Sequence, residues 1–294
     1  MKLYAPCYYQ KFKCIAYRCE HSCCVGWEID VDEDTLKKYQ RLTGDYASVI
    51  RDSICMEETP HFKLCACDRC PHLDERGLCR IILNVGEDYL CDICREHPRF
   101  YNFTSVAEVG LGMSCPEAAR LILSSPDYAE MDEVGEVDAA PDGIAFDGRA
   151  LRKKLYSILQ RTDISYTDRL ARIYRDHAIN PLEDAYWLEL LDGLEYLDNR
   201  HRDLFANYSA AHRPHGTDEY SERFLAYLIY RHCTEAVDTD DCRARLAFCL
   251  FCERLLASLI YTQQAVTLEA VASLASTVSE ELEYSEDNTC ALMG

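Results

Sequence analysis

The chain has few basic residues for its size. Its 294 residues include 31 Lys and Arg against 51 Asp and Glu, which gives a formal net charge of −20. Binding to a nucleic-acid backbone or to an anionic membrane surface requires a basic face. We therefore expect neither a nucleic acid nor a membrane as a partner.

Long apolar runs are also missing. The least charged stretch, residues 255–279, is interrupted by Thr262-Gln263-Gln264, and Thr267 is predicted to cap a new helix. It therefore falls short of the roughly 20 mainly apolar residues that a membrane span needs. No apolar run follows Met1 either, so we expect no secretory signal peptide and a cytoplasmic location.

Glycine is scarce, and the familiar catalytic and nucleotide-binding motifs are absent. Among 12 glycines the only Gly-x-Gly is Gly110-Leu111-Gly112, which lacks the third glycine of a dinucleotide-binding loop. The sequence contains no P-loop, no Gly-x-Ser-x-Gly and no His-Glu-x-x-His. No catalytic residue and no cofactor-binding loop can be named from such motifs.

Cysteine, in contrast, is abundant and unevenly placed. Of 18 cysteines, 13 lie in residues 7–115 and none lies in residues 116–232. A disulfide framework is the alternative explanation, but such frameworks usually belong to small secreted domains. In a reducing compartment, clustered thiols more often bind metals or do redox chemistry.

Two Cys-x-x-Cys pairs, Cys67/Cys70 and Cys91/Cys94, predict a metal site in this region. Two intervening residues let both thiolates turn toward one ion. Four thiolates suit zinc and an iron–sulfur cluster equally well. The adjacent Cys23 and Cys24 would point to opposite faces of an extended chain, so they serve different metals or one packs in the core.

The remaining thiols and histidines have simpler predicted roles. Cys249-x-x-Cys252 lies in an apolar run, where cysteine acts as a small buried residue. Three other thiols of the C-terminal half are expected to be buried in the same way: Cys233, Cys242 and Cys290. Three thiols of the N-terminal part are expected to be plain thiols: Cys7, Cys55 and Cys65. Three histidines among the cysteines could ligate a metal, although local hydrogen bonding or exposure is the simpler expectation: His21, His72 and His97.

The apolar pattern predicts a mainly α protein with an irregular, cysteine-rich, metal-binding N-terminal part packed with a C-terminal helical bundle. One helix is expected over residues 32–42, capped by Asp32 and stopped at Gly44. Another is expected to follow a capping box at Ser114–Glu117. Later helices are expected from Asn180, over 218–236, over 242–262 and after Thr267. We divide the chain into residues 1–126, an acidic linker at 127–147 without Lys or Arg, and residues 148–294.

Four segments together resemble the flagellin lysine-N-methylases. The first three contain most of the cysteines, and the fourth lies in the helical half: 12–32; 70–79 with 90–99; Ser114-Cys115-Pro116-Glu117-Ala118-Ala119; and Tyr227-Leu228-Ile229-Tyr230-Arg231 with 281–288. The cysteine segments alone also resemble small zinc- or iron-binding proteins. One departure is His97, where the resemblance leads us to expect an aromatic residue before Pro98-Arg99.

The resemblance implies methyl transfer to lysine ε-amines of flagellin or another protein with surface lysines. It also implies a [4Fe-4S] cluster, with S-adenosylmethionine as the methyl donor. Carried over by position, the cluster candidates are Cys14, Cys19, Cys23, Cys24, Cys70, Cys79, Cys91, Cys94 and Cys115, more than the four that a cubane needs. The catalytic base stays open, with Glu222 and Tyr230 as suggestions from the matched helix. The alternative function is a non-catalytic zinc- or iron-binding module with a helical partner-binding surface.

Overall fold

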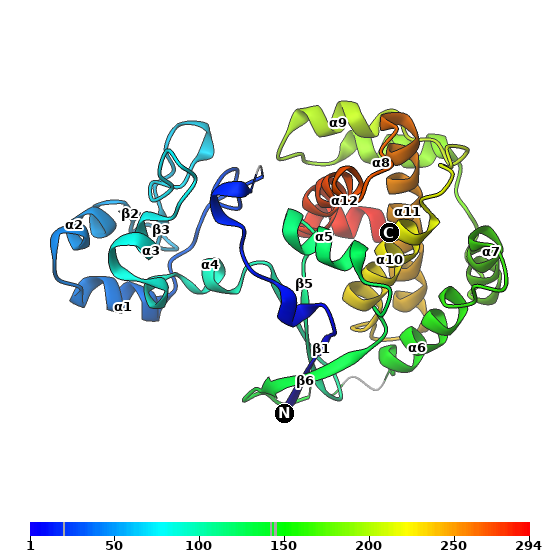
Figure 1. The fold of residues 1–294 in the computed structure, drawn as a ribbon, viewed down its shortest axis with the longest axis horizontal. Helices are drawn as coiled ribbons and strands as arrows, with labels where there is room; N and C mark the ends of the chain where they lie inside the picture. The colour runs from blue at the N-terminus through cyan, green and yellow to red at the C-terminus, as the bar shows by residue number, and fades with distance from the viewer. Residues whose placement is uncertain (20, 142, 144–145) are drawn as a thin grey trace. The chain divides into compact units, whose positions relative to one another are not determined.

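The computed structural model describes residues 1–19, 21–141, 143 and 146–294, which form two compact units. The larger unit combines residues 1–12 with residues 99–294, and the smaller unit is residues 13–98. Thirteen α-helices and six short strands are described, so the predicted mainly α class is confirmed (Figure 1).

A four-stranded sheet lies in the larger unit, with strand order β4-β5-β1-β6. Strand β1 runs parallel to β5 and antiparallel to β6, and β4 runs antiparallel to β5. Every residue of β5 is buried. The strands span Lys2–Pro6 (β1), Arg99–Phe103 (β4), Ala107–Leu111 (β5) and Met131–Glu136 (β6).

This sheet moves the predicted boundaries. The first twelve residues belong to the helical unit because β1 pairs with both β5 and β6. The segment expected to be an acidic linker contains β6, an edge strand in which Asp132, Glu133 and Glu136 are exposed, and Lys2 pairs with Glu133 at 2.8 Å. The sequence of β6 is acidic and shows no apolar alternation, so this strand could not be predicted. Its stability comes from main-chain pairing with β1.

Helices supply most of the core of the larger unit. They span Pro116–Ser124 (α5), Gly148–Leu159 (α6), Tyr166–Asp176 (α7), Asp184–Gly193 (α8), Asn199–Phe205 (α9), Asp218–Leu228 (α10), Thr239–Gln263 (α11), Leu268–Glu283 (α12) and Glu286–Met293 (α13). As predicted, α11 is buried along much of its length, and Cys249 and Cys252 are fully buried in it. Cys290 differs from the prediction, because it is exposed on α13. No helix in the described part of the chain combines the length and the apolar character that a membrane crossing requires.

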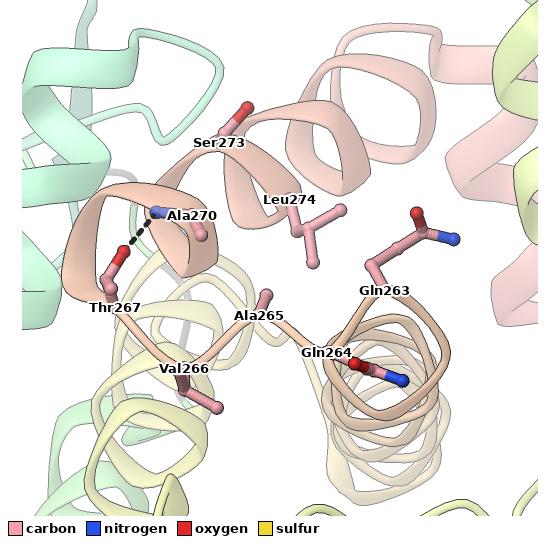
Figure 2. A pocket seen from close by; sticks show the side chains of 8 residues that line it. All are labelled: Gln263, Gln264, Ala265, Val266, Thr267, Ala270, Ser273 and Leu274. Atoms are coloured by element: carbon pink, nitrogen blue, oxygen red, sulfur yellow. Dashed lines mark hydrogen bonds between the residues drawn. The ribbon is translucent and has the colours of Figure 1, made fainter.

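Two predicted helix caps are confirmed. The Asp32 carboxylate accepts from the Thr35 amide at the start of α1 (Glu33–Arg41), and the Thr267 hydroxyl accepts from the Ala270 amide at the start of α12 (Figure 2). In both places the polar side chain precedes a helix whose first turn would otherwise leave amide groups unpaired.

Three predicted helix ends are wrong by a few residues. The N-cap of α5 is Cys115, with no side-chain cap, and the Ser114 hydroxyl has no hydrogen-bond partner among the described atoms. Helix α8 begins at Asp184 rather than at Asn180. Helix α1 ends where Leu42 becomes extended, and Gly44 instead precedes α2 with a φ of 105°.

The smaller unit is built from short elements around a separate core. Its helices are Glu33–Arg41 (α1), Asp45–Asp52 (α2), Arg80–Val85 (α3) and Asp92–Glu96 (α4), and its hairpin pairs Ile54–Cys55 (β2) with His61–Phe62 (β3). Two of the buried residues in this core are cysteines, Cys70 and Cys91. A core this small gains less from apolar burial than the core of the larger unit, so a bound metal would contribute strongly to its stability.

Gly110 on β5 should tolerate no side chain. A Cβ atom there would lie 2.3 Å from Cζ of Phe100 and 2.7 Å from Cε1 of Tyr230. We expect Gly110→Ala to lower the free energy of unfolding by about 1–3 kcal/mol through overpacking, measured by chemical denaturation. Gly193→Ala is the control, because nothing lies within 4 Å of its added Cβ. Equal stability of the two variants would contradict this packing.

Candidate metal centre

Five of the nine predicted cluster cysteines gather in the smaller unit. We call them the thiol centre: Cys24, Cys70, Cys79, Cys91 and Cys94. Cys70 and Cys91 are 7% and 1% exposed, and the other three pack against the same core. Each is close enough to others of the set for their charges to interact. Segments up to 70 residues apart in sequence thus meet at one place.

Main-chain pairing brings the first two of these thiols together. The Cys70 amide donates to the Cys24 carbonyl at 2.9 Å, and the Gly26 amide donates to the Asp68 carbonyl at 3.0 Å. Gly26 has a φ of 96°, a conformation that glycine adopts without strain. The N-terminal cysteine loop is therefore fixed against the loop that contains Cys70.

Short helices place the other three thiols. Cys79 is the N-cap residue of α3, and Cys91 is the N-cap residue of α4. Cys94 follows on α4 one turn later, on the same side as Cys91. The Cys-x-x-Cys spacing at 91–94 thus brings the two thiols within hydrogen-bonding distance of each other, because they lie one helical turn apart.

The thiols do not ionise independently. Burial raises the pKa of Cys70 to about 12, and it also raises the pKa of Cys79. A hydrogen bond with Cys91, together with burial, raises the pKa of Cys94, and the same hydrogen bond lowers the pKa of Cys91. Several thiolates at this place repel one another unless a cation compensates their charge. The donor set therefore fits a metal group, which binds thiolates.

Cys23 lies next to this centre rather than opposite it. A hydrogen bond with Cys23 lowers the pKa of Cys24 to about 7, so the two adjacent thiols contact each other. Residues 23 and 24 form a turn instead of an extended segment, so the condition for opposite faces is not met. Cys24 packs against the small core, whereas Cys23 is exposed.

The other predicted ligands lie elsewhere. Cys14 is exposed and its sulfur accepts from the Ala16 amide, whereas the Cys19 thiol donates to the His21 carbonyl at 3.0 Å. Cys115 belongs to the larger unit. Cys67, the first member of its pair, is exposed with a left-handed φ of 58°. Of the nine candidates, the structure thus brings five together in the smaller unit, with Cys23 beside them.

His72 has a structural role in the same core. It is 1% exposed, its Nδ1 is 2.8 Å from the Tyr46 hydroxyl, and its Nε2 is 2.9 Å from the Ser53 hydroxyl. Burial lowers the pKa of His72 to about 4, so the ring is neutral near pH 7. Because both ring nitrogens have hydroxyl partners, neither is available to a metal.

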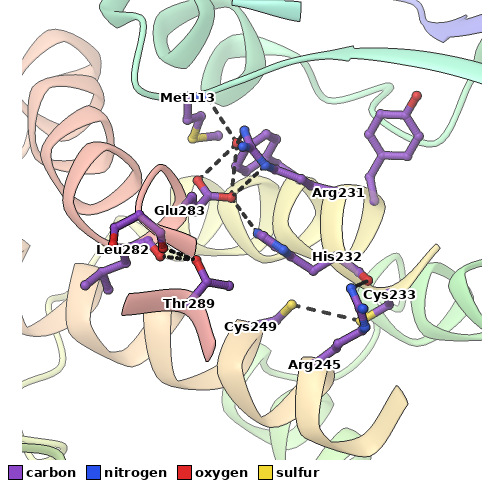
Figure 3. Close-up of polar contacts among 12 residues, drawn as sticks. Met113, Arg231, His232, Cys233, Arg245, Cys249, Leu282, Glu283 and Thr289 are labelled. Atoms are coloured by element: carbon purple, nitrogen blue, oxygen red, sulfur yellow. Dashed lines mark hydrogen bonds and ion pairs between the residues drawn. The ribbon is translucent and has the colours of Figure 1, made fainter. Parts of the chain in front are cut away.

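A second polar group lies in the larger unit, where the fourth resemblance segment folds (Figure 3). Glu283 is buried, and its carboxylate contacts His232 Nε2 at 2.6 Å and Arg231 Nε at 3.4 Å. The Tyr227 hydroxyl donates to the same carboxylate and accepts from the Met113 amide. Burial opposes ionisation, but Arg231 and His232 keep the pKa of Glu283 below its usual value. The carboxylate and guanidinium thus neutralise each other.

The segment that presents these side chains is a π-helix, Ile229–Cys233, that continues α10. The sequence pattern predicts an ordinary helix there, and nothing in apolar periodicity distinguishes the extra residue per turn. Arg231 lies over the rings of Phe100 and Tyr284, at 5.0 and 5.2 Å from their centroids. This packing explains the π-helix as a way to bury a charged side chain between aromatic rings.

Neither suggested catalytic base is available in this structure. The Glu222 carboxylate accepts from the Tyr128 hydroxyl at 2.8 Å and from Arg169 Nη1 at 2.6 Å, so both oxygens are engaged. Tyr230 is buried, and burial raises its pKa well above the ordinary value, which keeps the phenol protonated. Glu222 is explained by these contacts, whereas the buried Tyr230 hydroxyl has no hydrogen-bond partner among the described atoms.

Two further features of the larger unit are structural. A pocket of about 360 Å³ between the ends of α11 and α12 is lined by uncharged residues of the segment 263–274 (Figure 2). His201, Glu280 and Glu281 form the only described group of three or more His, Cys, Asp or Glu whose ligand atoms all lie within 4.8 Å. Glu281 already accepts from the Leu197 and Asp198 amides and contacts His201 Nδ1, which fixes the start of α9.

Comparison with known proteins identifies relatives of the chain. Over 136 residues the chain is 31% identical to the flagellar biosynthetic protein FliU of Salmonella muenchen, an alignment that covers 44% of this chain and 80% of that protein. The chain belongs to the family of FliU and the lysine-N-methylases. This is the family that the sequence motifs resemble.

Two longer members of this family are also similar. The lysine-N-methylases of Salmonella typhimurium and Salmonella choleraesuis are 31% and 32% identical over 136 and 137 residues. The alignments cover 44% of this chain but only 34% of each relative, so the chain matches about a third of their length. No family model matches the chain, and no solved structure matches it either.

Substitution of His72 tests whether this histidine has a structural role or binds a metal. We expect His72→Leu to leave the hydroxyls of Tyr46 and Ser53 without partners and to lower the free energy of unfolding by about 2–4 kcal/mol. Metal content per folded protein should not change. Elemental analysis and denaturation measure the two effects, with the half-buried His61→Gln as the control. Loss of metal from a folded variant would make His72 a ligand instead.

Proposed function

We propose that the chain is a protein-lysine N-methyltransferase that binds a [4Fe-4S] cluster at the thiol centre. The methyl donor is S-adenosylmethionine, and the acceptors are lysine ε-amines of flagellin. The observation that supports this most is the convergence of Cys24, Cys70, Cys79, Cys91 and Cys94 in one small core. The relatives named lysine-N-methylase support the reaction class.

The preference for a cluster over a single zinc ion comes from the family resemblance, because four thiolates suit both groups equally well. Five thiols also satisfy the four that a cubane requires.

The protein prepares the site for such a group in two ways. The small core excludes water from Cys70 and Cys91, which strengthens interactions with a bound cation. The Tyr39 hydroxyl donates to the Tyr89 carbonyl at 2.6 Å and lies 3.6 Å from the Cys91 sulfur, so this sulfur has a fixed polar neighbour. A bound [4Fe-4S] cluster would supply one-electron chemistry.

Methyl transfer places one demand on the acceptor. The lysine amine must lose its proton before its lone pair attacks the methyl carbon, and the new C–N bond forms as the C–S bond of the sulfonium breaks. The displaced proton passes to a base or to water. The net charge of −20 attracts a substrate that presents lysines, since long-range attraction raises the encounter rate.

The direct test is incubation of the anaerobically purified protein with flagellin and methyl-labelled S-adenosylmethionine. We expect label on lysine, located by peptide mass spectrometry, and none on flagellin whose lysine amines have been blocked by reductive alkylation. An intact cluster without any labelled lysine would contradict the proposal.

Single cysteine variants test the cluster and its ligands. We expect Cys→Ser changes at four of the five positions of the thiol centre to lower iron and acid-labile sulfide severalfold. The exposed Cys290 and Cys14 provide matched Cys→Ser controls, which should keep the wild-type content. Zinc without iron or sulfide in the wild-type protein would favour the non-catalytic zinc-binding module instead.

A further inference from the structure

A cavity of about 650 Å³ lies in the smaller unit beside the thiol centre. This volume is typical of a pocket for a small molecule. Helix α1 forms one wall, and the segment of residues 89–95 forms another. Its lining residues are Asp32, Asp34, Thr35, Lys37, Lys38, Arg41, Leu42, Tyr89, Asp92 and Arg95.

The cavity and the thiol centre share the segment from Tyr89 to Asp92. Tyr89 and Asp92 line the cavity, and Cys91 between them belongs to the thiol centre. The Asp32 carboxylate accepts from both the Thr35 and the Asp92 amides at 2.8 Å, so it holds the start of α4 against the start of α1. A ligand in the cavity would therefore lie next to the backbone that positions Cys91.

Two cations of this wall have no carboxylate partner in the described part of the chain. Lys38 donates to the Asp88 carbonyl at 3.3 Å, and Arg41, which is exposed, forms no hydrogen bond or ion pair with a described residue. They are three residues apart on α1 and thus share a face. In a chain with 51 acidic residues, a pair of unneutralised cations in one cavity indicates an anionic group on the ligand.

The same cavity offers partners for the other parts of an adenosyl amino acid. Asp34 lies one turn before Lys38 on the same face. Its exposed carboxylate is 3.4 Å from Lys37 Nζ, and Lys37 also pairs with Glu33 at 2.8 Å, so Asp34 can exchange this long contact for the ammonium group of a ligand. The ring of the half-buried Tyr89 can stack on a purine, and Leu42 adds apolar surface. Both signs of charge and an aromatic ring thus occur within one cavity.

We infer that this cavity binds S-adenosylmethionine, with Lys38 and Arg41 receiving its carboxylate. The inference rests on the proposed function for the identity of the donor. It goes further in assigning the donor to a place in the smaller unit, beside the thiol centre. The amino-acid end of the ligand, rather than the adenosine, is the part that these two cations recognise.

The test is equilibrium dialysis of the anaerobic, metal-loaded protein with radiolabelled S-adenosylhomocysteine, a product analogue that cannot transfer a methyl group. We expect the Lys38→Ala/Arg41→Ala double variant to bind it at least about tenfold more weakly, because two charge-assisted contacts are lost. Methylthioadenosine, which lacks the amino-acid end, should bind equally to the wild type and the double variant.

Lys63→Ala is the matched control. Lys63 is also exposed in the smaller unit and donates to a backbone carbonyl, that of Asp52, but it does not line the cavity. We expect it to bind S-adenosylhomocysteine as the wild type does. Iron, sulfide and circular dichroism spectra should be unchanged in all variants, which separates loss of binding from loss of folding.

The outcomes separate this inference from the proposed function. Equal binding by the double variant and the wild type, or no binding by the wild type, would overturn the donor site. Methylation of flagellin that is unaffected by the double substitution would also overturn the site while the function stands. Binding that depends on Lys38 and Arg41, without any methylated lysine, would support the site and contradict the function.

Discussion

The arrangement of the smaller unit depends on the free-energy cost of placing several buried thiols close together. Burial or neighbouring thiols raise the pKa values of Cys70, Cys79 and Cys94, whereas hydrogen bonds with an adjacent thiol lower those of Cys24 and Cys91. Apolar contacts alone would not require five sulfurs at one place. A cationic metal group would turn the repulsion between thiolates into attraction, and it would join short helices and turns that have little core of their own. The irregular local structure around the cysteines follows from this constraint.

Local signals in the sequence were sufficient where a single side chain decides the structure. Asp32 and Thr267 cap their helices because each is followed by a regular apolar pattern that no neighbour disrupts. The Ser114–Glu117 pattern failed although it matches a capping box. In the structure, Glu117 pairs with Arg120 and Ser276 donates to the Ser114 carbonyl, so tertiary contacts replaced the local cap. A local motif predicts well only where the surroundings offer its groups no better partner.

Pairings that are distant in sequence could not be predicted. β1 and β6 are more than 120 residues apart, and β6 is too acidic to show the alternation of a half-buried strand. The position of the thiol centre could be predicted only in part, because the spacing paired Cys91 with Cys94 but only the fold shows which of the nine cysteines lie together. Cys115 shows why, because its segment resembles the family as closely as the others do, yet it folds in the larger unit.

The fourth resemblance segment contributes a buried network of charges to the fold of the larger unit. Arg231, Glu283 and Tyr227 form a closed group in which charge is neutralised and hydrogen bonds are satisfied. A second buried pair, Glu108 with Arg152, connects β5 to α6 in the same unit through two contacts of 2.7 Å. Breaking such a pair leaves one buried charge uncompensated, which costs more than the pair contributes. Tyr230 in the same segment is the exception, because its buried hydroxyl has no hydrogen-bond partner among the described atoms. In the smaller unit the corresponding groups are the thiols of the thiol centre and the two unneutralised cations beside it. Polar groups without a protein partner are the ones that a bound ligand can satisfy.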